Sequence, residues 1–274
     1  MTCFRRFLVI TAGLAVLLTV AAPATAQLFT PPAEMPAGED YRVEVFGGLW
    51  NPSPDMTISS DEFGIAGTEI DFSRDLGIGP ERFGELRLRL RPARKHRFRI
   101  DYIPMKYSAQ HTVERRIVFR GIAYDIGAPV TSALKWSTWR LGYEYDIIHR
   151  SRGYFGVILE AKYTDIEASL EAAPLAREFT HARGPIPAIG AVFKVYPLSM
   201  LAIGGEVSAV KLPNNVLKSF TGEYIDFDVS ATVNLIESLG VQVGYRSIDL
   251  NVSSNEEGVA LKLDGAYVGA LVRF

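Results

Sequence analysis

The sequence has almost no cysteine. Its one cysteine among 274 residues is Cys3, so the chain has no internal disulfide and no zinc site built from several cysteines. Cys3 also lies in a segment that we expect to be removed on export, which would leave the mature protein without cysteine.

The chain also lacks an excess of charge of either sign. It has 29 Lys and Arg against 31 Asp and Glu, a net charge of −2, and this balance does not indicate a nucleic-acid-binding protein. Disorder is excluded over most of the length, because 48% of the residues are hydrophobic and 11% are aromatic. We therefore expect one folded domain and no nucleic-acid partner.

Long uncharged runs are missing everywhere except at the N-terminus. A pair of arginines precedes 16 uncharged residues, 7–22, and Ala24-Thr25-Ala26 has the small-residue spacing of a signal-peptidase site. Sixteen residues are short for a spanning helix, which needs about 20, so we predict a cleaved signal peptide over 1–26. Residues 27–40, which contain three prolines, are expected to form an irregular extension. Any membrane span in the remainder must then belong to a β-barrel.

Motifs for metals and cofactors are absent as well. No two of the four histidines have the spacing of metal ligands, and the glycines near residues 47 and 127 lack the patterns of nucleotide-binding loops. Asp61, Glu62, Asp71 and Asp75 gather in one expected loop, where we favour a solvated acidic loop over a calcium site. We expect no cofactor and no metal.

What the sequence has in abundance is alternation of apolar and polar residues. Residues 85–90 read Glu-Leu-Arg-Leu-Arg-Leu, and 97–102 and 140–146 alternate in the same way. A period of two places apolar side chains on one face only in a β-strand. The pattern predicts an all-β fold, a single antiparallel up-and-down transmembrane β-barrel over 41–274, with about ten strands and with eight or twelve as alternatives. The expected strands are 41–50, 83–91, 97–118, 122–148, 153–171, 186–197, 201–212, 222–236, 240–252 and 259–274.

The expected connections alternate in length. Tight turns are expected at 92–96, 149–153, 197–200 and 237–240. Long loops are expected at 51–82 and 171–185, and loops of intermediate length at 213–221 and 253–258. The turn at Arg120-Gly121 would join two strands longer than the roughly 9–11 residues that cross a bilayer, so this hairpin is expected to protrude. Short turns on one side and long loops on the other are typical of transmembrane barrels.

In a membrane barrel the apolar face of each strand meets lipid and the polar face lines the lumen. Because charges in a narrow interior are costly unless paired, we expect them to pair and to block the passage in part. The first strand departs from this pattern, since Phe46 and Trp50 would point inward unless a bulge at Gly47-Gly48 shifts the alternation. The predicted lumen-lining charge ladder consists of Glu85, Arg87, Arg89, Arg97, Arg99, Asp101, Arg140, Glu144, Asp146, Glu160, Lys162, Asp226 and Asp228.

Aromatic residues near the strand ends predict two girdles at the two membrane interfaces. The ordinary preference of aromatic residues for strands is the alternative explanation. Phe98, Tyr145, Tyr154, Tyr196 and Phe274 fall near the short turns, and Tyr107, Tyr163, Tyr224 and Phe227 fall near the long loops.

The chain ends in an aromatic residue after a strand with apolar side chains at every second position from Ala266 to Phe274. Together with the signal peptide and the alternating strands, this end resembles that of bacterial outer-membrane β-barrel proteins. The resemblance implies that Ala270, Val272 and Phe274 form a signal read by the barrel-assembly machinery. It also implies the outer membrane of a Gram-negative bacterium, with its lipid and lipopolysaccharide as partners.

We expect a non-enzymatic barrel that acts in small-solute passage, surface interaction or envelope structure, with no catalytic residues. One alternative is an outer-membrane enzyme near the rim, either an omptin-type protease or a lipid-modifying enzyme with a Ser–His pair, although no local motif joins the candidates. The other alternative is a soluble periplasmic barrel that binds an apolar ligand. The protease candidates are Asp125, Asp165, His111 and His181, and the lipid-modifying pair is Ser108 and His111.

Overall fold

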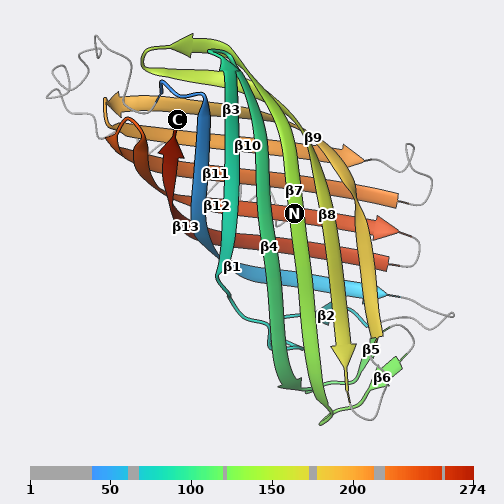
Figure 1. The fold of residues 1–274 in the computed structure, drawn as a ribbon. Helices are drawn as coiled ribbons and strands as arrows, with labels where there is room; N and C mark the ends of the chain where they lie inside the picture. The colour runs from blue at the N-terminus through green and yellow to red at the C-terminus, as the bar shows by residue number, and fades with distance from the viewer. Residues whose placement is uncertain (1–38, 61–67, 120–121, 173–177, 213–219, 255–256) are drawn as a thin grey trace, which may run out of the picture.

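The computed structural model describes residues 39–60, 68–119, 122–172, 178–212, 220–254 and 257–274. Ten long strands form one closed antiparallel sheet, which confirms the predicted ten-stranded all-β barrel (Figure 1). In the described residues, no helix is long and apolar enough to cross a membrane. The predicted signal peptide and the predicted extension, except for its last two residues, lie outside this range.

The barrel strands are 11 to 22 residues long. Three further short strands, β2, β5 and β6, belong to the loops. The barrel strands are β1 (Val43–Ser60), β3 (Phe83–Ala93), β4 (His96–Thr112), β7 (Pro129–Arg150), β8 (Gly153–Glu171), β9 (Glu178–Leu198), β10 (Leu201–Leu212), β11 (Phe220–Ile236), β12 (Leu239–Ser254) and β13 (Glu257–Arg273), and the loop strands are β2 (Ile70–Asp71), β5 (Ile117–Phe119) and β6 (Ile122–Tyr124).

The barrel closes between its first and last strands. β1 and β13 pair in unbroken register along 17 residues. The carbonyl oxygen of Phe274 continues this seam by accepting hydrogen bonds from the N–H groups of Arg42 (2.7 Å) and Val43 (3.0 Å). The seam therefore leaves no open sheet edge, which is the condition for a β-structure to cross a bilayer.

The connections alternate in length as predicted. Two-residue turns at 94–95, 151–152, 199–200 and 237–238 lie at the end of the barrel where β1 begins and β13 ends, which we call the turn end. The other five connections lie at the opposite, loop end, and four of them are longer than two residues. The fifth, between β12 and β13, has two residues, so the loop of intermediate length predicted over 253–258 is wrong. One tight turn requires glycine, because Gly153 has a φ of 150° and a Cβ atom there would lie 2.3 Å from the carbonyl oxygen of Lys194.

The predicted continuous strands 97–118 and 122–148 are wrong at the loop end. β4 stops at Thr112, and β5 and β6 pair with each other in a separate two-stranded sheet. The physical reason is burial: Val113 and Ile117 are each 1% exposed, so the chain turns over the barrel mouth instead of continuing outward.

Two predicted loops are shorter than expected. β1 runs to Ser60, because Met56 and Ile58 face the interior and are 1% and 2% exposed. β9 begins at Glu178, where it pairs with Leu170 of β8. The predicted loops 51–82 and 171–185 therefore begin or end inside regular strands.

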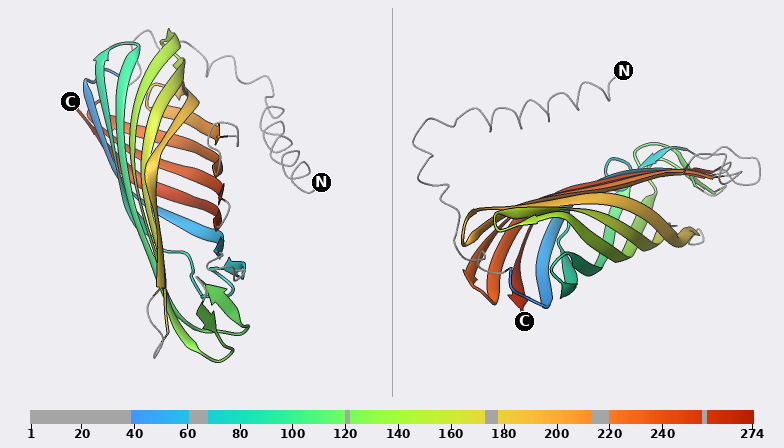
Figure 2. Two further views of the ribbon diagram at one scale, coloured as in Figure 1. Left: turned by 90° about the vertical axis from the view of Figure 1, so that its right-hand side faces the viewer. Right: turned by 90° about the horizontal axis from the view of Figure 1, so that it is seen from above.

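The wall of the barrel divides at the loop end. Pairing between β1 and β3 stops at Trp50 opposite Phe83, and pairing between β9 and β10 stops at Ile189 opposite Ala209. Beyond these points, β4, β7, β8 and β9 form one sheet, and β10 to β13 with β1 form another. The strands of the two sheets cross each other (Figures 1 and 2), and apolar side chains from both sheets form one core between them. This part of the molecule therefore resembles an orthogonal two-sheet packing.

The polarity of the strands reverses halfway along their length, as β7 shows. At its turn end Arg140 and Glu144 are buried, while Leu141 faces outward and is 54% exposed. At its loop end the pattern is opposite, with Trp136 2% exposed and Lys135 exposed. The turn-end half thus has a charged interior and an apolar exterior, and the loop-end half has an apolar interior and a polar exterior.

The first strand needs no bulge. Its register with β3 and β13 is unbroken through Gly47-Gly48, so of the two alternatives the inward direction of Phe46 and Trp50 holds and the bulge does not. Phe46 and Trp50 point inward and are 2% and 0% exposed. The indole N–H of Trp50 donates a hydrogen bond to the carbonyl oxygen of Gly265 (3.1 Å), so the interior accommodates these aromatic residues without a change of face.

Candidate functional site

All thirteen residues of the predicted charge ladder lie in the turn-end half of the lumen. Twelve of them are at most 9% exposed, and Arg89 is half-buried. They come from five strands, β3, β4, β7, β8 and β11, because charged residues occupy every second position of these strands on the inward face. The side chains meet across the lumen in two groups.

The first group surrounds Asp226 on β11. Its carboxylate accepts hydrogen bonds from Arg246 (2.8 Å) and Lys162 (3.1 Å), and Arg140 lies 3.4 Å away. Glu160 forms ion pairs with the same Arg140 (2.9 Å) and Lys162 (3.0 Å). Every member is at most 7% exposed, so these charges depend on one another and not on water for their stabilisation.

The second group lies nearer the turn end. Arg97 pairs with Asp146 (2.7 Å) and Glu144 (2.8 Å). Glu144 also pairs with Arg99 (3.2 Å), which in turn donates to Glu206 on β10. These contacts tie β4, β7 and β10 together across the barrel.

Two smaller pairings link the groups to β3. Arg87 contacts Glu85 (2.9 Å) and Asp228 of β11 (3.1 Å), and Arg89 pairs with Asp101 of the neighbouring strand. β3, which showed the clearest alternation in the sequence, therefore forms ion pairs with both β4 and β11.

The structure adds seven charged residues that the sequence analysis missed. For the six that lie on strands the signal was parity. Arg246, for example, continues the inward row of Gln242 and Gly244 on β12, and Glu206 continues that of Gly204 on β10. Small or neutral neighbours interrupted the alternation of charge on both strands. The missed residues are Glu39, Glu44, Arg91, Lys194, Glu206, Arg246 and Arg273.

With these additions, the described lumen holds ten basic and ten acidic side chains. The balance leaves no net charge to attract ions of one sign. The basic residues are Arg87, Arg89, Arg91, Arg97, Arg99, Arg140, Lys162, Lys194, Arg246 and Arg273, and the acidic residues are Glu39, Glu44, Glu85, Asp101, Glu144, Asp146, Glu160, Glu206, Asp226 and Asp228.

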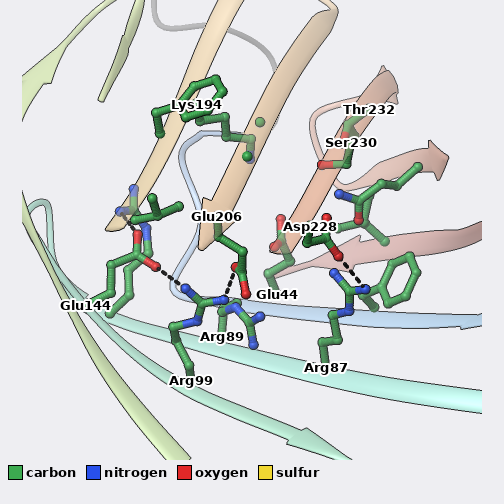
Figure 3. A pocket seen from close by; sticks show the side chains of 18 of the residues that line it. Glu44, Arg87, Arg89, Arg99, Glu144, Lys194, Glu206, Asp228, Ser230 and Thr232 are labelled. Atoms are coloured by element: carbon green, nitrogen blue, oxygen red, sulfur yellow. Dashed lines mark hydrogen bonds and ion pairs between the residues drawn. The ribbon is translucent and has the colours of Figure 1, made fainter. Parts of the chain in front are cut away.

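Little free space is left among these side chains. A cavity of about 90 Å³ lies beside the second group, with Arg99 and Arg89 on one side and Glu206, Glu44 and Asp228 on the other (Figure 3). Such a space accommodates a few water molecules. At the turn end, Glu39 lies across the lumen, where Lys194 (3.2 Å) and the hydroxyl group of Tyr196 donate to its carboxylate.

The loop end of the interior is filled by apolar side chains. Residues 70–78, 113–119 and 122–124 enter the space between the two sheets and together form what we call the cap. The cap side chains that face the core are at most 3% exposed, and they pack with Met105, Leu134 and Leu263 from the strands. These cap residues are Ile70, Phe72, Leu76, Ile78, Val113, Ile117 and Tyr124.

One ion pair joins two segments of the cap. Asp75 accepts hydrogen bonds from Arg115 (2.9 and 2.5 Å), and Arg115 also donates to the carbonyl oxygen of Glu69 (2.5 Å). The hydrogen bonds from Arg115, followed by those from Arg74 and the backbone of Asp71, outweigh burial and hold the pKa of Asp75 below its ordinary value. The predicted acidic loop is thus an ordered clamp in its described part.

The calcium alternative finds no support in these contacts. Asp75 is committed to Arg115, and a carboxylate oxygen of Asp71 accepts hydrogen bonds from the backbone of Ser73 (3.0 Å) and Arg74 (2.9 Å). Asp61 and Glu62 lie outside the described residues. Within the described part of the chain, no three His, Cys, Asp or Glu residues form a group that could hold a metal ion.

Replacing Asp75 with asparagine is expected to lower the free energy of unfolding by about 1 kcal/mol at neutral pH, because Arg115 loses its charged partner. The folded-state pKa of Asp75 is depressed, so its stabilisation is present above the ordinary carboxyl pKa of about 4 and is lost as the pH falls below it. Urea unfolding of the refolded protein from pH 7 to pH 3 measures this. The difference between the wild type and Asp75→Asn should shrink in acid, and a difference that is constant with pH would contradict the role of the clamp.

The outside of the turn-end half carries a continuous apolar belt. Leu86, Leu141, Leu159, Ile189 and Val243 are all at least 50% exposed although they come from five different strands. Water would solvate such a belt poorly, and exposed apolar patches of this extent mark a membrane or partner surface.

Comparisons with known proteins agree with this geometry. No protein-family model and no curated protein match the sequence. Among solved structures, the outer membrane protease OmpT from Escherichia coli has 10% sequence identity and a TM-score of 0.59, over 88% of this chain and 99% of that chain. The outer membrane protein OprG from Pseudomonas aeruginosa has 12% identity over 88% of this chain and 99% of that chain, at a TM-score of 0.41.

The chain has the fold of an outer-membrane β-barrel protein. The apolar belt of this outer-membrane barrel occupies the bilayer, which confirms the predicted location. The short turns of such barrels are periplasmic and the long connections face outward. The turn end is therefore the periplasmic end, and the loop-end half projects from the membrane into water.

The outer aromatic girdle contains other residues than those predicted. Trp139 stacks on Tyr102 with 4.4 Å between the ring centroids, and it pairs across the strands with Tyr163. Tyr102 and Trp139 were missed, and Tyr163 was correctly placed. Four of the predicted girdle residues point into the barrel instead, because they occupy inward-facing positions of their strands. Three of them are at most 5% exposed, and the fourth, Tyr154, lies under the guanidinium group of Arg97. These four are Tyr107, Tyr154, Tyr196 and Tyr224.

The described enzyme candidates do not come together. Asp125 is exposed and pairs with Arg116 (3.6 Å), whereas the ring of His111 lies beside Gly77 of the cap. Asp165 lies on the outward row of β8 opposite Ser137. Ser108 is exposed and His111 points inward, so the two lie on opposite faces of β4. The side chain of His181 lies outside the described residues.

Proposed function

We propose that this protein is a closed, non-enzymatic outer-membrane barrel that acts through its protruding outer half, as a surface for interaction outside the cell. The observation that carries this proposal is that two separate layers of side chains fill the interior. Paired charges fill the membrane-embedded half, and the apolar cap fills the outer half. Passage of solutes would require both layers to open.

The length of the strands supports a role for the outer half. A strand needs about 9–11 residues to cross a bilayer, whereas β7 has 22 residues and β8 has 19. The extra length builds a water-exposed body with its own apolar core. A barrel that served only as a membrane-spanning structure would not need this body.

Planar-bilayer recording tests the closed interior. Purified, refolded wild-type protein is expected to give no steady conductance steps, while a general porin at the same concentration gives them. Large, steady currents from the wild type would overturn the proposal in favour of a porin.

The enzyme alternative has a separate test. The wild-type protein should cleave a mixture of peptides at neutral pH no faster than the His111→Ala variant does. Cleavage that this substitution abolishes would make the barrel an enzyme and contradict the proposal.

A further inference from the structure

Basic residues crowd two of the four periplasmic turns. The turn between β3 and β4 contains Arg94 and Lys95, and the turn between β7 and β8 follows Arg150 and contains Arg152. The other two periplasmic turns, at 199–200 and 237–238, have no basic residue. The positive charge of the periplasmic rim is therefore gathered on one side of the barrel.

The two basic turns are neighbours in space. β4 and β7 pair with each other, and the backbone N–H of Asp146 donates a hydrogen bond to the carbonyl oxygen of Lys95 (2.9 Å). Arg94, Lys95 and Arg150 are exposed. Arg94 and Arg150 also line the same hollow at this end of the barrel.

Among the described residues, the acidic groups next to the exposed Arg94, Lys95 and Arg150 are largely bound to other partners. Asp146 is 0% exposed and is bound by Arg97 (2.7 Å) and by His149 (2.9 Å). Glu39 is 4% exposed and belongs to the lumen network. Asp40 is exposed in this region and lines a hollow together with Arg42 and Arg94. Among the described residues, positive charge therefore exceeds negative charge on this side of the rim.

A β-bulge places an apolar surface directly beside the basic turns. The register between β7 and β8 shifts between Asp146 and Ile148, so Ile147 and Ile148 both face outward and are each 51% exposed. Phe155, which pairs with Ile148, is 42% exposed on the same surface. Regular alternation would have turned one of the two isoleucines inward, and bulges often re-aim side chains at functional sites.

We propose that Arg94, Lys95, Arg150 and Arg152 bind the phosphate headgroup of an anionic phospholipid in the inner leaflet of the outer membrane. One of its acyl chains lies along Ile147, Ile148 and Phe155. The basic groups stand where the apolar belt ends, which is the level of the lipid phosphates. Arginine binds phosphate through paired, charge-assisted hydrogen bonds, and basic residues next to a membrane span attract anionic lipid. This inference goes beyond the proposed function and does not depend on it.

Native mass spectrometry of the refolded protein tests the site with phosphatidylglycerol and phosphatidylcholine supplied in equal amounts. The wild type is expected to retain phosphatidylglycerol preferentially. The variant with all four residues changed to glutamine should lose this preference at least tenfold. A matched variant carries glutamine in place of four exposed lysines of the outer half, and this variant should keep the preference for phosphatidylglycerol. These lysines are Lys106, Lys135, Lys211 and Lys262.

Equal retention of the two lipids by the wild type, or an undiminished preference in the periplasmic variant, would overturn the inference. Glycerophosphoglycerol, the headgroup without acyl chains, should not compete at the same concentration. Competition by it would identify a soluble anion as the ligand and would also overturn the lipid site. The double variant Arg94→Gln/Arg150→Gln, with an intermediate loss expected, provides the test if the fourfold variant does not refold.

Discussion

Replacing Asp226 with asparagine is expected to be among the most damaging single changes in the barrel, with a loss of about 3–5 kcal/mol in the free energy of unfolding. The substitution keeps the size of the side chain and removes its charge. Arg246, Lys162 and Arg140 would then face a neutral group in an interior that is sealed from water. Glu160 contacts two of these cations and cannot balance all three.

Urea unfolding in phospholipid vesicles, followed by the heat-dependent shift in gel mobility, measures this loss. Asp55→Asn is the matched control, because Asp55 is an exposed aspartate on the outward face of β1. The control should change the midpoint little. Equal effects of the two substitutions would mean that the lumen charges are solvated and that the interior is not sealed.

The second large effect is expected on the lipid-facing side. Leu141→Arg places a charge in the apolar belt, where it should cost about 2–4 kcal/mol if the position lies near the bilayer midplane. Ser137→Arg introduces the same side chain on the same outward face of β7, four residues further out. This position lies beyond Trp139 of the outer girdle, where the exterior is polar.

The yield of folded barrel after refolding into vesicles, together with its unfolding midpoint, compares the two variants. We expect a severe defect for Leu141→Arg and nearly wild-type behaviour for Ser137→Arg. A more damaging Ser137→Arg variant would show that the membrane lies around the outer half instead of the turn-end half.

Alternation in the sequence was sufficient to predict the barrel, its strand number and the inward face of most strands. Side-chain direction in a strand depends on parity alone, so Arg87, Arg140 and Asp226 could be placed before any contact was known. The same rule would have placed Tyr154 and Tyr224 inward. Reading aromatic residues by their distance from the strand ends, and not by their parity, led to the error in the girdles.

The cap could not be predicted in this way. Its contacts join segments that are far apart in the chain, such as Asp75 with Arg115, which lie 40 residues apart. The strands 97–118 and 122–148 were expected to form a simple protruding hairpin, because periodicity does not tell whether an apolar face meets lipid or a protein core. Only the packing of Val113 and Ile117 against both sheets shows that the outer half has a core of its own.

The three tryptophans of the chain provide the most direct test of which face meets lipid. Trp139 is 48% exposed in the outer girdle, whereas Trp50 and Trp136 are 0% and 2% exposed inside the barrel. Vesicles of brominated phospholipid quench only tryptophans that touch the acyl chains. The measurement is the quenching of refolded wild-type protein and of the Trp50→Phe, Trp136→Phe and Trp139→Phe variants. Quenching that disappears in Trp139→Phe alone is the predicted result, and quenching that persists in Trp139→Phe would contradict a charged lumen enclosed by an apolar, lipid-facing belt.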